Sequence, residues 1–154
     1  VVATLSAACE FRVLCLFFLS AVVGVDTAIA QNKSGMDSFV FEGEVDIAPE
    51  LMAEISKEDR LILKLFHPAD GIEMDTKYSI VSDFILPLKF RISPSIVMDG
   101  GARHETYMIE VFTDKDQDVL RVAPGEVYGV TPGTVQVGTK GLRIVLRHIR
   151  ESKH

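Results

Sequence analysis

The carboxylates with the clearest capacity for chemistry stand at alternate positions of one polar segment, at Asp114, Asp116 and Asp118. This spacing opens calcium-binding loops, in which side-chain oxygens converge on one hard cation. The pattern then breaks, because Val119 stands where such a loop turns on a glycine and Gly125 stands where it needs a bidentate glutamate. Glu126 follows one position late. We therefore interpret the segment as a solvated hairpin tip and keep calcium binding as the alternative.

Histidine and methionine side chains supply potential nitrogen and thioether ligands for copper, at His67, His104, His148, Met74, Met98 and Met108. A blue-copper centre also needs a thiolate, and the two cysteines lie near the amino terminus, at Cys9 and Cys15. A copper(I) site of methionine and histidine stays open as an alternative. We expect instead that Met108 packs in the core and that His67 and His104 belong to turns. The sequence thus predicts no metal site and no cofactor.

Residues that could serve nucleophilic or acid–base catalysis lack the surroundings that such chemistry needs. No G-x-S-x-G elbow surrounds the serines of the central region, which are Ser79, Ser82, Ser93 and Ser95. Glu42 and Glu44 project from one face of a predicted strand, without the hydrophobic setting of a catalytic acid. No glycine-rich turn leads from a strand into a helix to hold phosphate. The sequence therefore predicts that the protein is not an enzyme.

An apolar run, Val13–Val25, follows Arg12 and has the length of a signal-peptide core. It is shorter than the ~20 apolar residues that a membrane-spanning helix needs. Ala28 and Ala30 are small residues at the two positions that signal peptidase reads, and the mature chain is predicted to start at Gln31. We predict a signal peptide at 1–30 and a flexible arm at 31–37. The protein is then periplasmic or secreted, and it contacts the membrane only through the signal before cleavage.

The charge balance narrows the classes of partner. The chain has 16 basic and 22 acidic residues and a formal net charge of -6. This composition disfavours nucleic acid and anionic lipid as partners, because both attract basic proteins. A protein partner remains the expectation.

A period of two in the apolar residues dominates the chain after residue 37. In Phe39–Ile47, apolar side chains occupy one parity and carboxylates the other, which indicates a strand with one buried face. Pro87 lacks a backbone N–H and therefore indicates an edge strand or a strand start. Further strands are predicted at Leu61–Phe66, Leu86–Ile92, Thr106–Phe112, Val119–Val122, Thr134–Val137 and Leu142–Ile149. With a short helix at Pro49–Ile55, residues 38–150 are predicted to form an all-β, immunoglobulin-like antiparallel sandwich of about seven strands.

Short motifs in a fixed order extend over nearly the whole chain after the signal. They are Glu44–Leu51, Leu63–Phe66 with Gly71 and Met74 following, Leu86–Phe90, Val97–Met98, Pro124–Gly129 and Val137–Leu146. In this order they resemble the C-terminal immunoglobulin-like β domain of CycH-type cytochrome c biogenesis proteins. The resemblance implies a role in cytochrome c maturation, with components of that machinery as protein partners.

We expect, from these observations together, an exported non-enzymatic β-sandwich that binds protein through its loops or an edge strand. The candidate contact residues are Met74, Tyr78, Met98, Tyr128, Asp114, Asp116 and Asp118. Two alternatives remain, a periplasmic copper- or calcium-binding protein and a cell-envelope structural or assembly module unrelated to haem.

Overall fold

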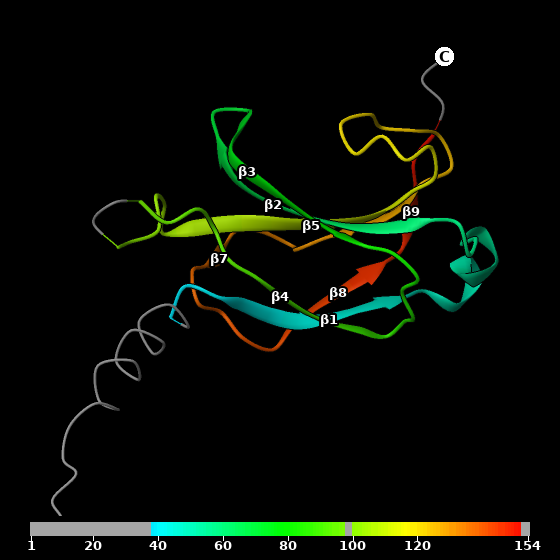
Figure 1. The fold of residues 1–154 in the computed structure, drawn as a ribbon, viewed down its shortest axis with the longest axis horizontal. Coiled ribbons are helices and arrows are strands. Elements are labelled where there is room, and N and C mark those ends of the chain that lie inside the picture. The colour runs from blue at the N-terminus through cyan, green and yellow to red at the C-terminus, as the bar shows by residue number, and fades with distance from the viewer. Residues whose placement is uncertain (1–37, 98–99, 152–154) are drawn as a thin grey trace, which may run out of the picture.

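Two β-sheets face each other in the computed structural model, which describes residues 38–97 and 100–151 (Figure 1). Within these residues the chain forms nine strands and one short 3-10 helix, η1, at Pro49–Glu54. The strands are β1 Phe41–Ile47, β2 Arg60–Ala69, β3 Ile72–Val81, β4 Leu88–Ile92, β5 Thr106–Asp114, β6 Val127–Val130, β7 Val135–Gln136, β8 Leu142–Leu146 and β9 His148–Ile149. This confirms the predicted all-β sandwich with one short helix.

The predicted signal peptide, its cleavage residues and the predicted arm at 31–37 lie outside the described residues, as does Met98. No helix in the described part of the chain is both long enough and apolar enough to cross a membrane.

The smaller sheet has the strand order β4-β1-β8, and the larger sheet has the order β3-β2-β5-β6-β9, with β7 paired to β5. Pairing is antiparallel throughout, with one exception. Strand β1 pairs parallel with β8, from Gly43 opposite Leu142 to Ile47 opposite Leu146. This one pair departs from the predicted antiparallel arrangement. Strand β1 is central in its sheet, and its two neighbours come from distant parts of the chain.

The core lies between the sheets and follows the predicted alternation. Phe41 and Val45 of β1 are fully buried, whereas Glu42 and Glu44 between them are half-buried. Opposite them, β2 and β5 contribute the fully or almost fully buried side chains Leu61, Leu63, Leu65, Tyr107, Ile109 and Val111. Strand β4 begins directly after Pro87 and lies at the edge of its sheet, which agrees with the placement inferred from the missing N–H.

A tight hairpin joins β2 to β3, and the sequence analysis missed its second strand. Asp70 and Gly71 form the turn with φ values of 50° and 81°, the positive pair that a type I′ hairpin turn requires. Its two strands pair from Ala69 opposite Ile72 to Leu61 opposite Val81, with one irregularity between Leu65 and His67.

Other element assignments also differ from the prediction. Residues Val119–Val122 form no strand and belong to the loop between β5 and β6. Their backbone bonds locally, with the Arg121 N–H donating to the Asp118 carbonyl at 2.9 Å. Strand β6 was not among the predicted strands. The predicted strand Leu142–Ile149 divides at Arg147 into β8 and β9, which belong to different sheets.

The two sheets approach each other closely where β6 passes β8. A Cβ atom added at Gly129 would stand 2.3 Å from the Val145 carbonyl oxygen and 3.2 Å from the Leu146 nitrogen. Next to this point the Arg147 N–H donates to the Tyr128 carbonyl at 3.1 Å. Only glycine fits here, because every neighbouring atom belongs to the backbone and cannot move aside.

Replacing Gly129 by alanine tests this contact. Gly129→Ala should lower the free energy of unfolding by about 1–3 kcal/mol, as overpacking does in a well-packed core. Gly133→Ala is the matched control, since a Cβ at Gly133 meets no atom within 4 Å. Chemical denaturation of both variants measures the difference. Equal midpoints for the two would contradict the close approach of β6 and β8.

Candidate functional site

Three acidic side chains gather at the ends of the loop that joins β5 to β6. Asp114 ends β5, Glu126 directly precedes β6 and Asp116 lies in the loop between them. One carboxylate oxygen from each lies within 4.8 Å of the others. The sequence pattern had instead grouped Asp118 with the first two aspartates. Asp118 lies outside the cluster and accepts a hydrogen bond from the Leu120 N–H at 3.2 Å.

Asp114 is fully buried and does not belong to a solvated tip, so the interpretation of this residue as exposed is wrong. Its Oδ2 atom accepts hydrogen bonds from Nε of Arg60, at 3.0 Å, and from Nη2 of Arg60. The two residues are direct cross-strand partners on β2 and β5. The register of the sheet thus places a guanidinium beside the buried carboxylate, which sequence reasoning could not anticipate.

Glu126 is also fully buried, and neither of its carboxylate oxygens makes a hydrogen bond of good geometry with the described residues. Burial raises the pKa of Glu126 to about 7, and the charges of Asp116 and Asp114 add to the rise. The Ala123 backbone and the guanidinium of Arg150 oppose it. A carboxyl group in this setting exchanges its proton near neutral pH.

Arg150 is held over the same end of the sheet by its backbone and its side chain. Its N–H donates to the Glu126 carbonyl at 2.8 Å. Its guanidinium carbon stands 5.2 Å from the ring centre of Phe112 and 4.9 Å from that of Tyr128, within the range of cation–π attraction. Arg150 also forms ion pairs with Glu126 at 3.1 Å and with Glu110 at 2.8 Å. The guanidinium of Arg150 therefore forms ion pairs with two carboxylates.

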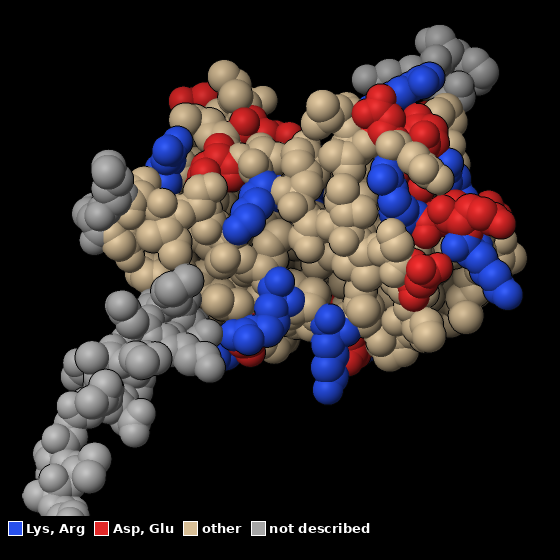
Figure 2. Space-filling view, viewed as in Figure 1, with Lys and Arg blue, Asp and Glu red and all other residues tan. Residues whose placement is uncertain are grey.

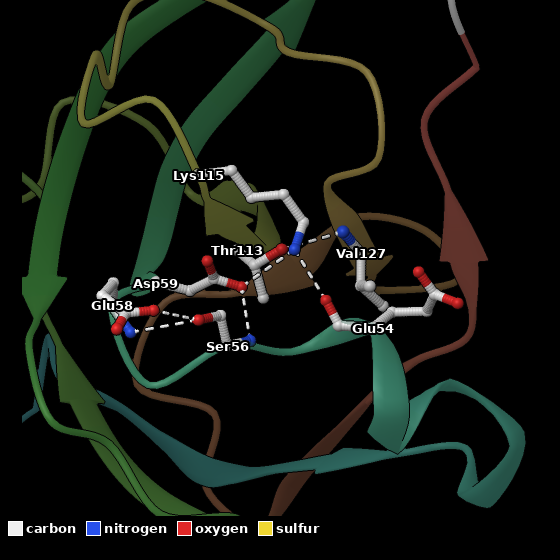
Figure 3. Close-up of polar contacts among 7 residues, drawn as sticks. All are labelled: Glu54, Ser56, Glu58, Asp59, Thr113, Lys115 and Val127. Atoms are coloured by element: carbon white, nitrogen blue, oxygen red, sulfur yellow. Dashed lines mark hydrogen bonds and ion pairs between the residues drawn. The ribbon is translucent and has the colours of Figure 1, made fainter.

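Lys115 stands between two members of the cluster in sequence but is directed elsewhere (Figure 3). Its Nζ donates to the Glu54 carbonyl at 2.6 Å and to Asp59 Oδ2 at 3.0 Å. Nearby, the Val127 N–H donates to the Thr113 hydroxyl at 2.9 Å. These contacts fix both ends of the β5–β6 loop.

Strand β3 offers a different kind of site, the free edge of the larger sheet. Among the described residues, β3 pairs with β2 alone. Three apolar side chains on it are exposed, with relative accessibilities of 66% for Ile72, 44% for Met74 and 49% for Ile80. Tyr78 is half-buried on the same strand. Exposed apolar groups on an unpaired edge are a template for strand addition.

The proposed partner residues therefore fall into two regions. Met74 and Tyr78 lie on β3, whereas Tyr128 lies on β6 and lines a surface hollow with Leu51, Val122 and His148. Strands β2 and β5 separate these regions in the sheet. Asp116 and Asp118 are exposed in the loop that precedes β6, whereas Asp114 is fully buried and offers no contact surface. The larger sheet thus presents two candidate contact areas in place of one.

The three histidines of the copper alternative do not converge on one point of the described structure. His67 and His104 stack face to face, with ring centres 3.9 Å apart and planes at 3°. Nitrogen lone pairs lie in the ring plane, so two parallel rings do not point them at one ion. His148 packs against Tyr128 in the other region, at 5.2 Å between ring centres.

The histidine pair packs against Tyr107, whose hydroxyl donates to Asp75 Oδ2 at 2.6 Å. Burial and this hydrogen bond raise the pKa of Tyr107 to about 12. The tyrosine is therefore a neutral donor at physiological pH, and it ties β5 to the irregular part of β3. We interpret these rings as structural.

On the face seen in Figure 2, acidic and basic side chains are interspersed, without a continuous basic area.

Comparison with protein-family models and with curated proteins gives no match. Among solved structures, the chain is similar to an alternative pilotin from the type II secretion system of Vibrio cholerae. The TM-score is 0.45 and the sequence identity is 13%, over 71% of this chain and 96% of that chain. We base no inference on a likeness this distant.

The raised pKa of Glu126 predicts a specific pH dependence of stability. The folded protein keeps this proton to a higher pH than the unfolded chain does. The free energy of unfolding therefore falls as the pH rises from 4.5, the ordinary pKa of a glutamate, to about 7, the pKa of Glu126 in the folded protein. Glu126→Gln should remove up to about 3 kcal/mol of this fall.

Denaturant titrations at several pH values between 4.5 and 8, in buffer with chelator, measure the effect. Glu105→Gln, at an exposed glutamate, is the control and should keep the wild-type profile. If Glu126→Gln has the same pH profile as the wild type, Glu126 does not carry a raised pKa.

Proposed function

We propose that the protein is an exported, non-enzymatic β-sandwich that binds a protein partner along the free edge of β3. The observation that carries the proposal is the combination of an unpaired edge and exposed apolar side chains on one ten-residue strand. At ~3.3 Å per residue, a strand of this length accommodates a partner segment of about six to eight residues. The proposal of export rests on the apolar run Val13–Val25.

Edge strands of soluble proteins are usually short, charged, or covered by another element. Strand β3 is long, and its charged residues do not cover Ile72 and Ile80, which are 66% and 49% exposed. A partner strand would gain backbone hydrogen bonds from the edge and apolar contacts from these side chains. An alternating apolar and polar segment is the chemistry that this edge would recognise.

The opposite side of β3 makes the edge rigid. Eight residue pairs join β3 to β2, and the hydroxyl of the core residue Tyr107 donates a hydrogen bond to Asp75 of β3. A rigid edge loses little conformational entropy when a partner adds to it, and this favours binding.

The finer proposal concerns the identity of the partner. The order of motifs from Glu44–Leu51 to Val137–Leu146 resembles a domain of cytochrome c biogenesis proteins, and we propose an accessory role in cytochrome c maturation. The envelope structural or assembly module unrelated to haem is the competing proposal. The identity of the bound protein separates the two.

If the partner binds by strand addition, a charge introduced on β3 should lower the affinity for the partner. Ile80→Lys should weaken binding of the partner at least tenfold, because it removes an apolar contact and places a desolvated ammonium at the edge. Leu120→Lys is the matched control, at a residue 82% exposed in the β5–β6 loop. It should bind as the wild type does.

The partner is first isolated by cross-linking from a photoreactive residue at position 80 and identified by mass spectrometry. Its affinity for the wild type and for both variants is then measured with purified components. Equal affinities of wild type and Ile80→Lys would rule out the β3 edge as the contact.

Deleting the gene tests the role in cytochrome c maturation. Haem-stained gels should show a lower content of c-type cytochromes in the deletion strain, restored by the wild-type gene and not by the Ile80→Lys gene. Unchanged cytochrome levels, together with a cross-linked partner outside the maturation machinery, would support the envelope module instead.

A further inference from the structure

We propose that Asp114, Asp116 and Glu126 bind a divalent cation through oxygen ligands, with Ca²⁺ as the ion that suits them. This site lies on the β5–β6 loop and is independent of the proposed protein contact along β3. The separation of the ligand oxygens fits the ion. Oxygens within 4.8 Å of one another are close to the spacing of three ligands that stand at about 2.3–2.6 Å from one Ca²⁺.

Buried oxygens without hydrogen bonds are a second, independent indication. Asp114 Oδ1 and Glu126 Oε1 are buried and accept no hydrogen bond of good geometry from the described residues, and Glu126 Oε2 is approached by Arg150 Nε at 3.1 Å as an ion pair. Both side chains are fully buried. Buried polar atoms nearly always have a partner, and an exception often marks the place of an ion.

The neighbouring cations leave room for an ion. Arg60 occupies Oδ2 of Asp114, so Oδ1 remains. Arg150 contacts Oε2 of Glu126 and is shared with Glu110. Lys115 is bound to Asp59 and to the Glu54 carbonyl, away from the cluster (Figure 3).

Asp116 supplies the accessible side of the site. Its side chain is 29% exposed, and the nearest guanidinium, that of Arg121, stands 3.8 Å from its Oδ2 and is 72% exposed itself. Such an exposed ion pair is weak and is easily displaced by a divalent ion. The ion would therefore enter past Asp116 and complete its coordination with water.

The structure changes which residue is the third ligand. The alternating aspartates indicated Asp118, but the backbone turns it away, where its Oδ1 accepts the Leu120 N–H. The ligand in its place is Glu126, twelve residues after Asp114. Three carboxylates with water favour an affinity in the range of extracellular modules, with a Kd of about 0.1–1 mM.

The test is titration of the chelator-treated protein with CaCl₂ at pH 8, followed by calorimetry and by thermal unfolding. We expect saturable binding with one ion per chain and a melting temperature about 4 °C higher at 10 mM Ca²⁺. Glu126→Gln and Asp116→Asn should each weaken binding at least tenfold. Asp116→Asn changes a partly exposed residue, so it separates lost binding from lost folding.

Asp118→Asn is the matched control, since asparagine keeps the oxygen that caps Leu120, and it should bind Ca²⁺ within twofold of the wild type. The proposal is overturned by any of three results. These are an unchanged melting temperature at 10 mM Ca²⁺, an equal rise with NaCl of matched ionic strength, and wild-type affinity in both Glu126→Gln and Asp116→Asn. Each of these leaves binding of protein at β3 unaffected.

Discussion

The close approach of β6 and β8 at Gly129 is the constraint on which the functional end of the molecule depends. Because Gly129 has no side chain, the backbone of β8 can come near enough for Arg147 to bond Tyr128. The chain then passes from the smaller sheet to the larger one, and β9 pairs with β6. This passage delivers Arg150 to the outer face of the larger sheet, over Phe112 and beside Glu126. Without this passage between the sheets, Arg150 would not pair with the buried Glu126.

The ion pairs on this outer face form a continuous series across the larger sheet. Lys64 of β2 bridges Glu73 of β3 and Glu110 of β5, and Arg150 bridges Glu110 and Glu126. The two cations also cover aromatic rings, Lys64 over Phe66 and Arg150 over Phe112, so their stems shield apolar surface while their charges pair. The free edge at β3 and the acidic loop are thus ends of one polar network.

Much of the fold could be predicted from the sequence, because burial on one face imposes a period of two on β1, β4 and β5. Strand β3 also has alternating apolar residues and follows the Asp70–Gly71 pair, which is a strong hairpin signal, yet no strand was predicted there. The acidic cluster is different. Glu126 is brought to Asp114 by pairing of β5 with β6, and its burial contradicts the usual exposure of charged residues. No local pattern around Glu126 indicates that it lies beside Asp114 or that it is buried.

The parallel pairing of β1 with β8 has a consequence for the order of events in folding. Asp46 and Arg143, joined by an ion pair of 2.9 Å in this pairing, are 97 positions apart in the chain. The smaller sheet can therefore close only when the last strands are available, and the loop closed in doing so is long. Domains dominated by such non-local contacts fold in milliseconds to seconds, far more slowly than helical bundles. The smaller sheet thus stays incomplete until β8 joins it.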